Sequence, residues 1–374
     1  MPTIQNLLDQ LDRHFPWNRV EKWDTVGLHI GDRNAHVDAV HVCYEVSDAA
    51  IDEAIARGAG AIVAYHPLLF RPMASLDFAN PTARLAMRIM RAQMALICVH
   101  SALDGAPPPH ALGDALAAQL GLSDVRVAAA SGAPQLVKIA TFVPPAHLDA
   151  VRAALWGADA GQIGAFYDEA SFAVAGDGTF RALEGANPSI GEIGHRETVA
   201  EVQLEVLAPE TKWPAVVAAL RNAHPYEEVA YNVTALLNDD KAGSYGPLRI
   251  GQVEQQSLSS WVETVREKLN PPSIRVVVPP DFGAVETVAC SPGSGASFIG
   301  KLERGTTFVC ADIKHHDALQ ARARGVALVD VTHAATETAT VPMMADALEN
   351  IDGLSVTREA KADNPFGVWP QEKG

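Results

Sequence analysis

Histidines stand at the ends of several apolar segments of this chain. "AIVAYH" ends at His66, "ALICVH" ends at His100 and "VALVDVTH" ends at His333. Acidic residues follow two of them four positions later, Asp104 after His100 and Glu337 after His333. Imidazole nitrogens and carboxylate oxygens are the ligands that proteins offer to Zn, Fe, Mn or Ni. The pattern therefore suggests metal chemistry.

A fourth apolar segment, "TFVCAD", ends at Asp312, and His316 follows four residues later. A histidine and a carboxylate at this spacing can face the same way across one helical turn. One such pair carries little weight in a chain with 13 histidines and 45 acidic residues. Four similar ends are harder to dismiss, but spacing alone does not show that they converge, so a metal site and a structural role for these histidines both stay open.

The composition restricts the classes of partner. A length of 374 residues suggests two or three domains, and a 48% apolar content provides for sizeable cores. The formal charge of −16 argues against nucleic acid or an anionic membrane as the main partner. We expect a small-molecule substrate, and an anionic one stays possible because a local cation can reverse the field in a pocket.

The cysteines and the start of the chain indicate a reducing compartment. All four cysteines lie within apolar runs and none forms a CxxC pair, so we expect buried reduced thiols. The first residues, "MPTIQNLLDQLDRHF", lack the basic and apolar regions of a secretory signal. No apolar run is long enough to span a bilayer. We therefore expect a cytoplasmic protein without membrane contact.

The first third of the chain alternates helical and strand patterns, which is typical of an α/β layer. Ser47 is the expected N-cap of one helix and Gly58 the residue just after its end. The predicted helices cover 4–15, 47–58, 81–93 and 110–121, and the predicted strands cover 37–46, 59–67 and 94–100. In such sheets, ligands bind beyond the carboxyl ends of the strands, where His66 and His100 stand.

The middle of the chain reads as a separate module. The small residues of 124–133 predict a structureless linker, and 238–246 reads as the exit linker. Between them, strands and helices alternate around a Gly-rich stretch in the order of a ferredoxin-like unit. The predicted strands cover 137–143, 198–209 and 229–236. A Pro-Pro turn followed by a helix is predicted within 144–161, and a second helix covers 212–224.

The last part returns to the α/β pattern. Its predicted helices cover 257–269, 295–305, 314–325 and 337–350, and its predicted strands cover 273–279, 286–292, 306–312 and 326–333. We predict a two-lobed α/β body interrupted by an inserted ferredoxin-like, PII- or CutA-like α+β module. The boundaries are 1–125 for the first lobe, 134–237 for the module and 246–374 for the second lobe.

Two further stretches could take part in function. "SPGSGAS" (291–297) could bind an anion, but a tight turn that uses the freedom of Gly293 and Gly295 is favoured. The GK[ST] element of a P-loop and the G-x-S-x-G elbow of serine hydrolases are both missing. "HPYEEVAY" (224–231) carries a histidine and two acids within the middle module, where we favour a structural or rim role.

The chain resembles the NIF3 family, also called DUF34 and often labelled GTP cyclohydrolase 1 type 2 homologues. The family's "ENWDNVGLQVG", "HHPLIF", "AHTNLD" and "TGDIKHH" correspond to "EKWDTVGLHIG", "YHPLLF", "VHSALD" and "CADIKHH" here, and the final H-x3-E corresponds to His333 and Glu337. "GQIGAFYDEASF", "GDGTFRALEGANPSIG" and "AHPYEEVAY" match the long form of the family. The resemblance covers nearly the whole chain in order.

The resemblance implies two α/β lobes around a dinuclear metal site, an optional inserted module and a toroidal homohexamer. It points to a divalent transition metal (Zn, Fe or Mn), with one or two ions per chain. By this resemblance, the metal ligands or cavity residues are His66, Asp104, His333, Glu337 and Tyr65. His100 joins them as a candidate proton carrier, and Asp312 and His316 match a motif associated with proton transfer or support of the ligands.

The chain departs from the family pattern at several of these positions. Tyr65 replaces the first histidine of the family pair, and a phenol must lose a proton from a pKa of about 10 to bind a metal. Tyr44 and Glu45 replace a Leu-Asp pair, and Cys310 and Ala311 replace the threonine and glycine of "TGD". These changes indicate a remodelled pocket and leave open one ion or two, and a preference for iron.

We therefore predict an enzyme, a metal-dependent hydrolase that attacks a C=N, amide or heterocycle carbon through metal-activated water, GTP cyclohydrolase-like by resemblance. His100 or His316 would carry the proton. Two alternatives stay open. One is a non-catalytic metal-binding regulatory or scaffold oligomer, and the other is a specialised catabolic hydrolase with a remodelled pocket.

Overall fold

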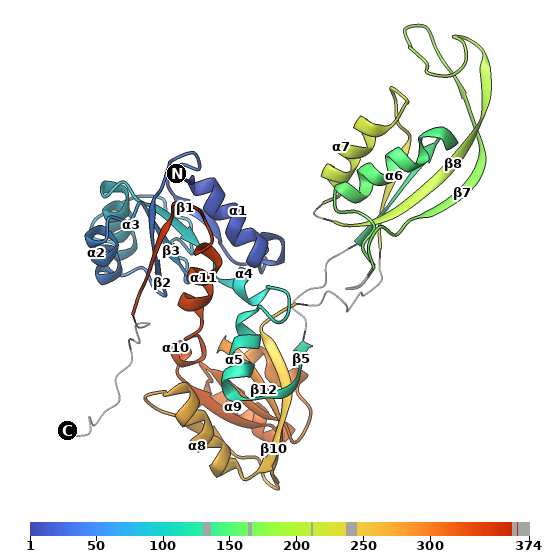
Figure 1. Ribbon diagram of the computed structural model, residues 1–374. Coiled ribbons are helices and arrows are strands. Elements are labelled where there is room, and N and C mark those ends of the chain that lie inside the picture. The colour runs from blue at the N-terminus through green and yellow to red at the C-terminus, as the bar shows by residue number, and fades with distance from the viewer. Residues whose placement is uncertain (130–135, 164–166, 211, 237–244, 361–364, 366–374) are drawn as a thin grey trace, which may run out of the picture. The chain divides into compact units, whose positions relative to one another are not determined.

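A computed structural model describes residues 1–129, 136–163, 167–210, 212–236, 245–360 and 365. The chain divides into two compact units. Unit 1 combines Met1–Gly132 with Tyr245–Gly374, and unit 2 is Ala133–Ser244. Figure 1 shows the elements of each.

Unit 1 contains a first sheet of five strands, in the order β1-β4-β3-β2-β15. β15, β2, β3 and β4 run parallel to one another, and β1 pairs antiparallel with β4. The strands are β1 (Gly27–Ile30), β2 (Ala39–Cys43), β3 (Ala61–Ala64), β4 (Ala95–Cys98) and β15 (Ser355–Arg358). The carboxyl ends of β3 and β4 therefore lie at one edge, immediately before Tyr65-His66 and Val99-His100.

Helices cover both faces of the first sheet, because apolar side chains leave each strand in both directions. One core includes Val40, Val63 and Ile97 with the apolar sides of α1 and α11, and the other includes Ile62 and Leu96 with α2 and α3. The helices are α1 (Ile4–His14), α2 (Asp48–Ala56), α3 (Pro81–Arg91) and α11 (Thr340–Leu348). Ser47 caps α2 by accepting a hydrogen bond from the Ala50 amide, and Gly58 has a φ of 68°, as predicted.

The second sheet of unit 1 has six strands, in the order β11-β14-β13-β12-β10-β5. β12, β13 and β14 are parallel, so their carboxyl ends also share one edge. The strands are β5 (Ser123–Ala129), β10 (Leu248–Gln256), β11 (Arg275–Val277), β12 (Val285–Ser294), β13 (Thr307–Ala311) and β14 (Ala327–Val331). Asp312 follows β13, and His333 opens a short helix just beyond β14.

This sheet is also covered on both faces. α5 and α8 pack on one face around Trp261, and α9 packs with a 3-10 helix, η4, on the other around Phe308. The elements are α4 (Ser101–Asp104), α5 (Leu112–Leu120), α8 (Leu258–Leu269), η4 (Ala296–Lys301), α9 (His315–Arg324) and α10 (His333–Thr336), and η1 (Trp17–Arg19) precedes β1. The predicted α/β fold is confirmed for this body.

Two local predictions are wrong. Residues 124–129 of the expected linker belong to β5, because their backbone pairs antiparallel with β10, while 130–133 lie outside the described residues. The predicted helix 295–305 is only η4, since Gly295 lies against Phe308 and Cys310, and Leu302 already has an extended backbone. Within the described residues, no helix combines the length and apolarity needed to cross a membrane.

The described residues of unit 2 form an antiparallel sheet in the order β7-β8-β6-β9, with two α-helices on the same face. Its elements follow the order β-α-β-β-α-β. They are β6 (Leu136–Val143), η2 (Pro145–His147), α6 (Leu148–Gly157), β7 (Phe172–Arg181), β8 (Arg196–Pro209), α7 (Trp213–Ala223) and β9 (Tyr231–Ala235). β7 forms in the Gly-rich stretch. Most of the predicted exit linker lies outside the described residues, and the reading of this unit as an inserted ferredoxin-like module stays a prediction.

Candidate metal centre

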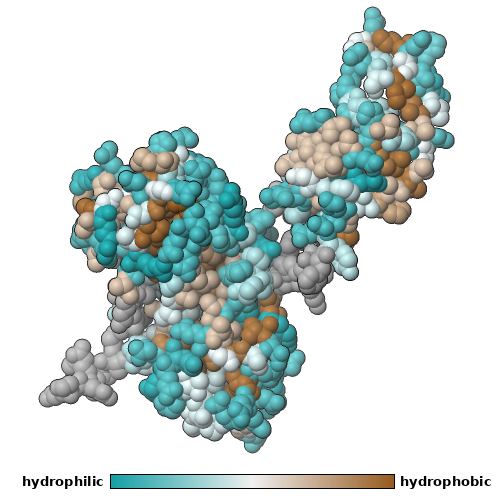
Figure 2. Space-filling model, viewed as in Figure 1, coloured by the Kyte–Doolittle hydropathy of each residue, from teal (hydrophilic) through white to brown (hydrophobic). Residues whose placement is uncertain are grey.

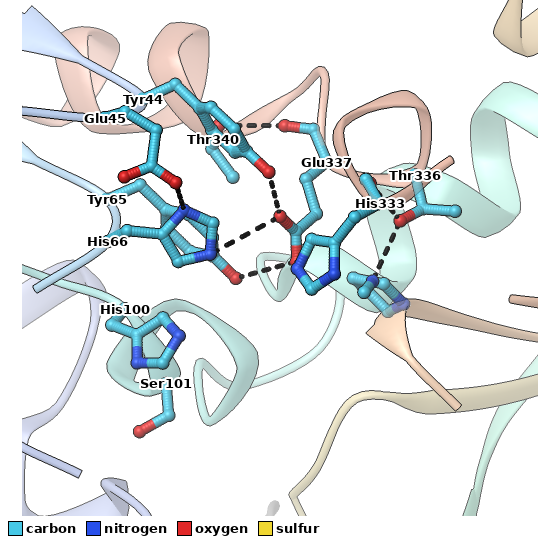
Figure 3. Close-up of polar contacts among 12 residues, drawn as sticks. Tyr44, Glu45, Tyr65, His66, His100, Ser101, His333, Thr336, Glu337 and Thr340 are labelled. Carbon is cyan, nitrogen blue, oxygen red and sulfur yellow. Dashed lines mark hydrogen bonds and ion pairs between the residues drawn. The ribbon is translucent and has the colours of Figure 1, made fainter. Parts of the chain in front are cut away.

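Three potential metal ligands from the two sheets of unit 1 meet at one place. His66 follows β3, while His333 and Glu337 begin and follow α10. One ligand atom from each lies within 4.8 Å of the other two. Figure 3 shows both imidazoles pointing toward the Glu337 carboxylate. Two nitrogens and a carboxylate oxygen at this spacing form a possible metal site.

Glu337 is the centre of this group and only 3% exposed. The Tyr44 hydroxyl donates a hydrogen bond of 2.6 Å to Oε2, and the Tyr65 hydroxyl lies 3.5 Å from Oε1. His333 Nε2 lies 3.2 Å from Oε1, and His66 Nε2 lies 3.8 Å from Oε2. Each carboxylate oxygen thus faces one phenol and one imidazole (Figure 3).

Three imidazoles are each paired with a carboxylate through Nδ1, which leaves Nε2 to point elsewhere. His333 Nδ1 lies 2.6 Å from Asp312, and His66 Nδ1 lies 2.8 Å from Glu45. The third pair joins His100 Nδ1 to Asp24 at 2.8 Å. Histidines that bind metals usually have such a partner, because it fixes the ring orientation and raises the basicity of the free nitrogen.

Burial and close contacts both shift the pKa values of the titratable groups at the centre. Burial lowers the pKa of His333, but its bonds to Asp312 and Glu337 outweigh burial and raise that pKa to about 10. Burial and the negative charge nearby raise the pKa values of Tyr44 and Tyr65. Both phenols are therefore neutral donors around neutral pH.

Asp104, which is not part of this three-residue group, has an unpartnered oxygen. Its Oδ1 is fully buried and has no hydrogen-bond partner among the residues that the structure describes. Burial first, and then the charge of Glu337, raise the pKa of Asp104 to about 7. A buried carboxylate oxygen without a partner is costly unless an ion or a proton compensates it. This observation fits a cation at the centre.

Gly293 lies directly against two of the potential ligand atoms. Its φ is 56°, and a Cβ at this position would stand 2.7 Å from Glu337 Oε1 and 2.8 Å from His333 Nε2. Its amide donates a hydrogen bond of 2.8 Å to the Thr336 hydroxyl. The backbone thus approaches two of the ligand atoms directly, which only glycine permits.

Two of the supporting residues hold unusual backbone conformations. His100 has a φ of 34° and Asp312 a φ of 61°, in the region that residues with a side chain rarely occupy. Such conformations cost on the order of 1–3 kcal/mol and are retained mainly where the surrounding structure imposes them. Both residues belong to carboxylate-imidazole pairs, so the strain coincides with the centre.

The structure brings together most of the residues singled out in the sequence. His66, His333 and Glu337 share one group, and Tyr65 contacts it through its hydroxyl. The His100 ring lies 5.2 Å from the His66 ring. His316 is exposed on the first turn of α9, where its ring contacts the His315 ring at 5.4 Å.

Sequence reasoning did not assign Asp24 or Gly293 to this centre. The Asp24 side chain is fully buried, and besides the ion pair with His100 it accepts a hydrogen bond of 3.1 Å from the Ser101 amide. It belongs to the "EKWDTVGLHIG" motif, and Gly293 belongs to "SPGSGAS". Both motifs were visible, but neither signalled that its residue lies beside His100 or Glu337.

Comparison with known proteins identifies the family. The sequence profile described as "Duf34/NIF3 (NGG1p interacting factor 3)" matches residues 2–365. The chain belongs to the DUF34/NIF3 family. The resemblance seen in the sequence is thereby confirmed over almost the whole chain.

Relatives of this DUF34/NIF3 protein match it over nearly their full length. "GTP cyclohydrolase 1 type 2 homolog" of Mycobacterium tuberculosis is 36% identical over 360 residues, which cover 94% of this chain and 93% of the relative. The protein of the same name from Bacillus subtilis is 33% identical over 370 residues, covering 97% and 94%.

Solved structures of the family share the fold. The Bacillus cereus protein related to NIF3 has a TM-score of 0.82 at 29% identity and covers 98% of this chain and 99% of that one. Staphylococcus aureus SA1388 has a TM-score of 0.75 at 25% identity with the same coverage. The chain therefore has the α/β architecture of NIF3 proteins.

Proposed function

We propose that this DUF34/NIF3 protein is a metal-dependent hydrolase that acts on a C=N, amide or heterocycle carbon. The observation that carries the proposal is the convergence of His66, His333 and Glu337, which come from distant parts of the chain and place their ligand atoms within 4.8 Å. The unpartnered oxygen of Asp104 and the missing side chain at Gly293, beside the ligand atoms, support the binding of a cation there.

His66 and His333 would hold the ion through Nε2, and Glu337 and Asp104 would hold it through carboxylate oxygens. A divalent transition metal at this place supplies Lewis acidity toward water and toward a substrate carbonyl or C=N group. Asp312 holds the His333 ring by a hydrogen bond to Nδ1, and Glu45 lies 2.8 Å from His66 Nδ1. His333 must give up its proton to bind an ion, because its pKa is raised to about 10 without one.

His100 is the better placed of the two candidate proton carriers. Its Nδ1 faces Asp24, and its ring lies beside those of His66 and Tyr65, at 5.2 and 5.4 Å. Burial lowers the pKa of His100, but the bond to Asp24 and the neighbouring acids raise it overall. A proton held at His100 Nε2 can pass to a leaving nitrogen or oxygen. For His316, exposed on α9, such a role stays a prediction.

We infer that one ion binds per chain. Tyr65 stands where the family pattern has a histidine, and Tyr44 and Tyr65 both turn their hydroxyls toward Glu337. A neutral phenol that donates to the carboxylate occupies an oxygen that a second ion would need. The identity of the ion follows the donor set of nitrogen and oxygen, which suits Zn, Fe or Mn.

The names of the relatives point to a substrate class. Because proteins 33–36% identical over nearly the whole length are named "GTP cyclohydrolase 1 type 2 homolog", we propose GTP or a related heterocycle as the first substrate to test. A specialised catabolic substrate is the alternative within the same chemistry. The homohexamer and the cytoplasmic location suggested by the sequence stay predictions.

The test combines metal analysis with turnover. Protein purified without chelator is analysed for metals and assayed with GTP and with a panel of cyclic amides, alongside Asp104→Ala and Glu337→Ala. We expect bound metal and hydrolysis in the wild type and at least a hundredfold lower turnover in both variants, which is roughly 2.7 kcal/mol. His195→Ala removes an exposed imidazole in unit 2 and serves as the control. Full activity in metal-free wild-type protein would refute the proposal.

A second candidate is a metal-binding regulatory or scaffold protein without turnover. The observation in its favour is the pair of phenols that face the Glu337 carboxylate oxygens, which leaves less room beside this carboxylate for a substrate. Stoichiometric metal with no turnover of any substrate in the panel would favour this candidate.

A further inference from the structure

The sheet of unit 2 has one face covered by helices and one face that they leave open. Leu204 and Val206 of β8 pack beneath α6 and α7 in the buried core. Because side chains alternate along a strand, Glu201 and Gln203 point to the opposite face. Phe142 of β6, which pairs with Gln203, lies on the same open face.

The glycine at position 176 leaves a hollow in this open face. Along β7, Val174, Gly176, Gly178 and Phe180 share the face of Glu201, since Gly176 pairs directly with Glu201. A Cβ on Gly176 would meet no atom within 4 Å, and a Cβ on Gly178 would collide with the Glu201 carboxylate. The missing side chain at Gly176 therefore leaves open space beside Val174, whereas the Glu201 carboxylate occupies the space over Gly178.

The hollow is the floor of a cavity of about 720 Å³. This volume falls within the range of small-molecule sites, roughly 300–1,000 Å³. Residues 182–190 and 226–230 form parts of its wall. The Asn187 amide donates a hydrogen bond of 2.9 Å to Glu227, which joins these two segments. Figure 2 shows apolar surface among polar side chains over the β7–β8 hairpin.

Aromatic rings and carboxylates dominate the chemistry of the cavity. Phe142, Phe180 and Tyr226 line it, and the rings of Phe180 and Tyr226 lie 6.4 Å apart. The Tyr226 hydroxyl donates a hydrogen bond of 2.9 Å to Glu201, which fixes that carboxylate at the wall. Aromatic faces beside negative charge attract organic ammonium groups.

The charge of the lining has one sign on the open face. Glu201, Glu227 and Glu228 line the cavity, and the described lining residues include no lysine. Arg181 is the single cation among them, but it follows Phe180 in β7, so its side chain leaves on the opposite face. An anion would meet unbalanced carboxylates here, whereas a cation would be paired.

From these observations we propose that unit 2 binds a small organic cation, an ammonium group carried on an apolar or aromatic body, in the cavity over Gly176. The ammonium lies beside Glu201, and the apolar body lies against the Phe142, Phe180 and Tyr226 rings. This site is separate from the candidate metal centre and does not depend on hydrolase activity.

The test uses the full-length protein and titration calorimetry. Benzyltrimethylammonium is the probe, and phenylacetate is the anionic control with the same ring. We expect the cation to bind at least tenfold more tightly than phenylacetate. Glu201→Gln should weaken the cation about tenfold, because it removes the charge and keeps the shape. Glu210→Gln, an exposed acid of unit 2 outside the cavity, should change nothing.

A second variant fills the hollow. Gly176→Leu places a side chain in the free space and should abolish binding of the cation, while Gly157→Leu, at a glycine whose added Cβ also meets nothing, should leave it unchanged. Thermal melting shows that each variant is folded. Equal affinity for phenylacetate, no binding of the cation by the wild type, or wild-type affinity in Gly176→Leu would overturn the proposal. If the wild type does not bind the cation and Gly176→Leu changes the oligomeric mass, the face is a subunit interface, which also overturns the proposal.

Discussion

The metal centre of unit 1 and the cavity of unit 2 are built in opposite ways. The centre consists of side chains from distant segments that hold one another, as Tyr44, His66 and His333 do around Glu337. The cavity lies over Gly176, a strand position without a side chain where an added Cβ would meet no atom within 4 Å. Single side chains therefore determine binding at the metal centre, whereas the free volume determines binding in the cavity.

The largest expected effect comes from removing the shared carboxylate. Glu337→Ala should lower the metal content after dialysis at least tenfold, because it removes one ligand and leaves His66 and His333 without a common partner. Emission spectrometry of the metal measures this. Binding of benzyltrimethylammonium should stay at its wild-type value. A variant that retains its metal would show that Glu337 is not a ligand.

Tyr65→His tests whether the phenol limits the centre to one ion. The substitution restores the family residue and removes the hydroxyl that lies 3.5 Å from Glu337 Oε1. We expect the metal content to rise from about one ion toward two per chain. Tyr44→Phe, which removes the other phenol hydroxyl without adding a ligand, should remain near one ion. An unchanged count in Tyr65→His would show that Tyr65 does not exclude a second ion.

Asp312→Asn weakens the support of one ligand without touching the ligand itself. Loss of such a partner typically costs 10- to 100-fold in metal affinity. The pKa of His333 in the metal-free protein should also fall from about 10, because the bond to Asp312 helps to raise it. Competition with a chelator measures affinity, and NMR titration measures the pKa. Asp149→Asn, at an exposed position in unit 2, is the control. A normal affinity with a normal pKa would contradict this role.

Gly293→Ala and Gly58→Ala separate backbone strain from crowding at the centre. Both glycines have a positive φ, 56° and 68°, but only at Gly293 would a Cβ meet ligand atoms. Gly58→Ala should destabilise by about 1 kcal/mol and leave metal binding intact. Gly293→Ala should cost about 1–3 kcal/mol and weaken metal binding as well. Denaturant unfolding with metal analysis compares them, and equal results for both would remove Gly293 from the centre.

Ser47→Ala is expected to have the smallest effect. The hydroxyl caps α2 by accepting from the Ala50 amide, and its loss should destabilise the protein by about 1 kcal/mol. Metal content should not change, since the Ser47 hydroxyl bonds to the Ala50 amide and not to a proposed ligand. Unfolding curves test the first statement. A loss of metal would show that the centre depends on general stability.

Local signals in the sequence predicted local structure well. The cap at Ser47 and the turn at Gly58 depend on neighbouring residues alone, and both occur. The strand ends at His66 and His333 could be anticipated because parallel strands end at one edge of a sheet. That these two edges face each other across unit 1 is a long-range fact, which the spacing of residues does not contain.

Pairings between distant segments escaped prediction for the same reason. β15 pairs with β2 although more than 300 positions separate Ser355 from Ala39. β5 pairs with β10 although the whole of unit 2 lies between them in the sequence. The contact between Asp24 and His100 depends on the pairing of β1 with β4. Short strands and single ion pairs of this kind carry weak patterns, and tertiary packing decides them.

Anomalous diffraction at the Zn, Fe and Mn edges tests the central claim most directly. We predict one peak per chain, roughly 2.0–2.3 Å from His66 Nε2, His333 Nε2 and a Glu337 oxygen. Crystals of metal-loaded protein without a peak there, or with their peaks only at other sites, would contradict the account.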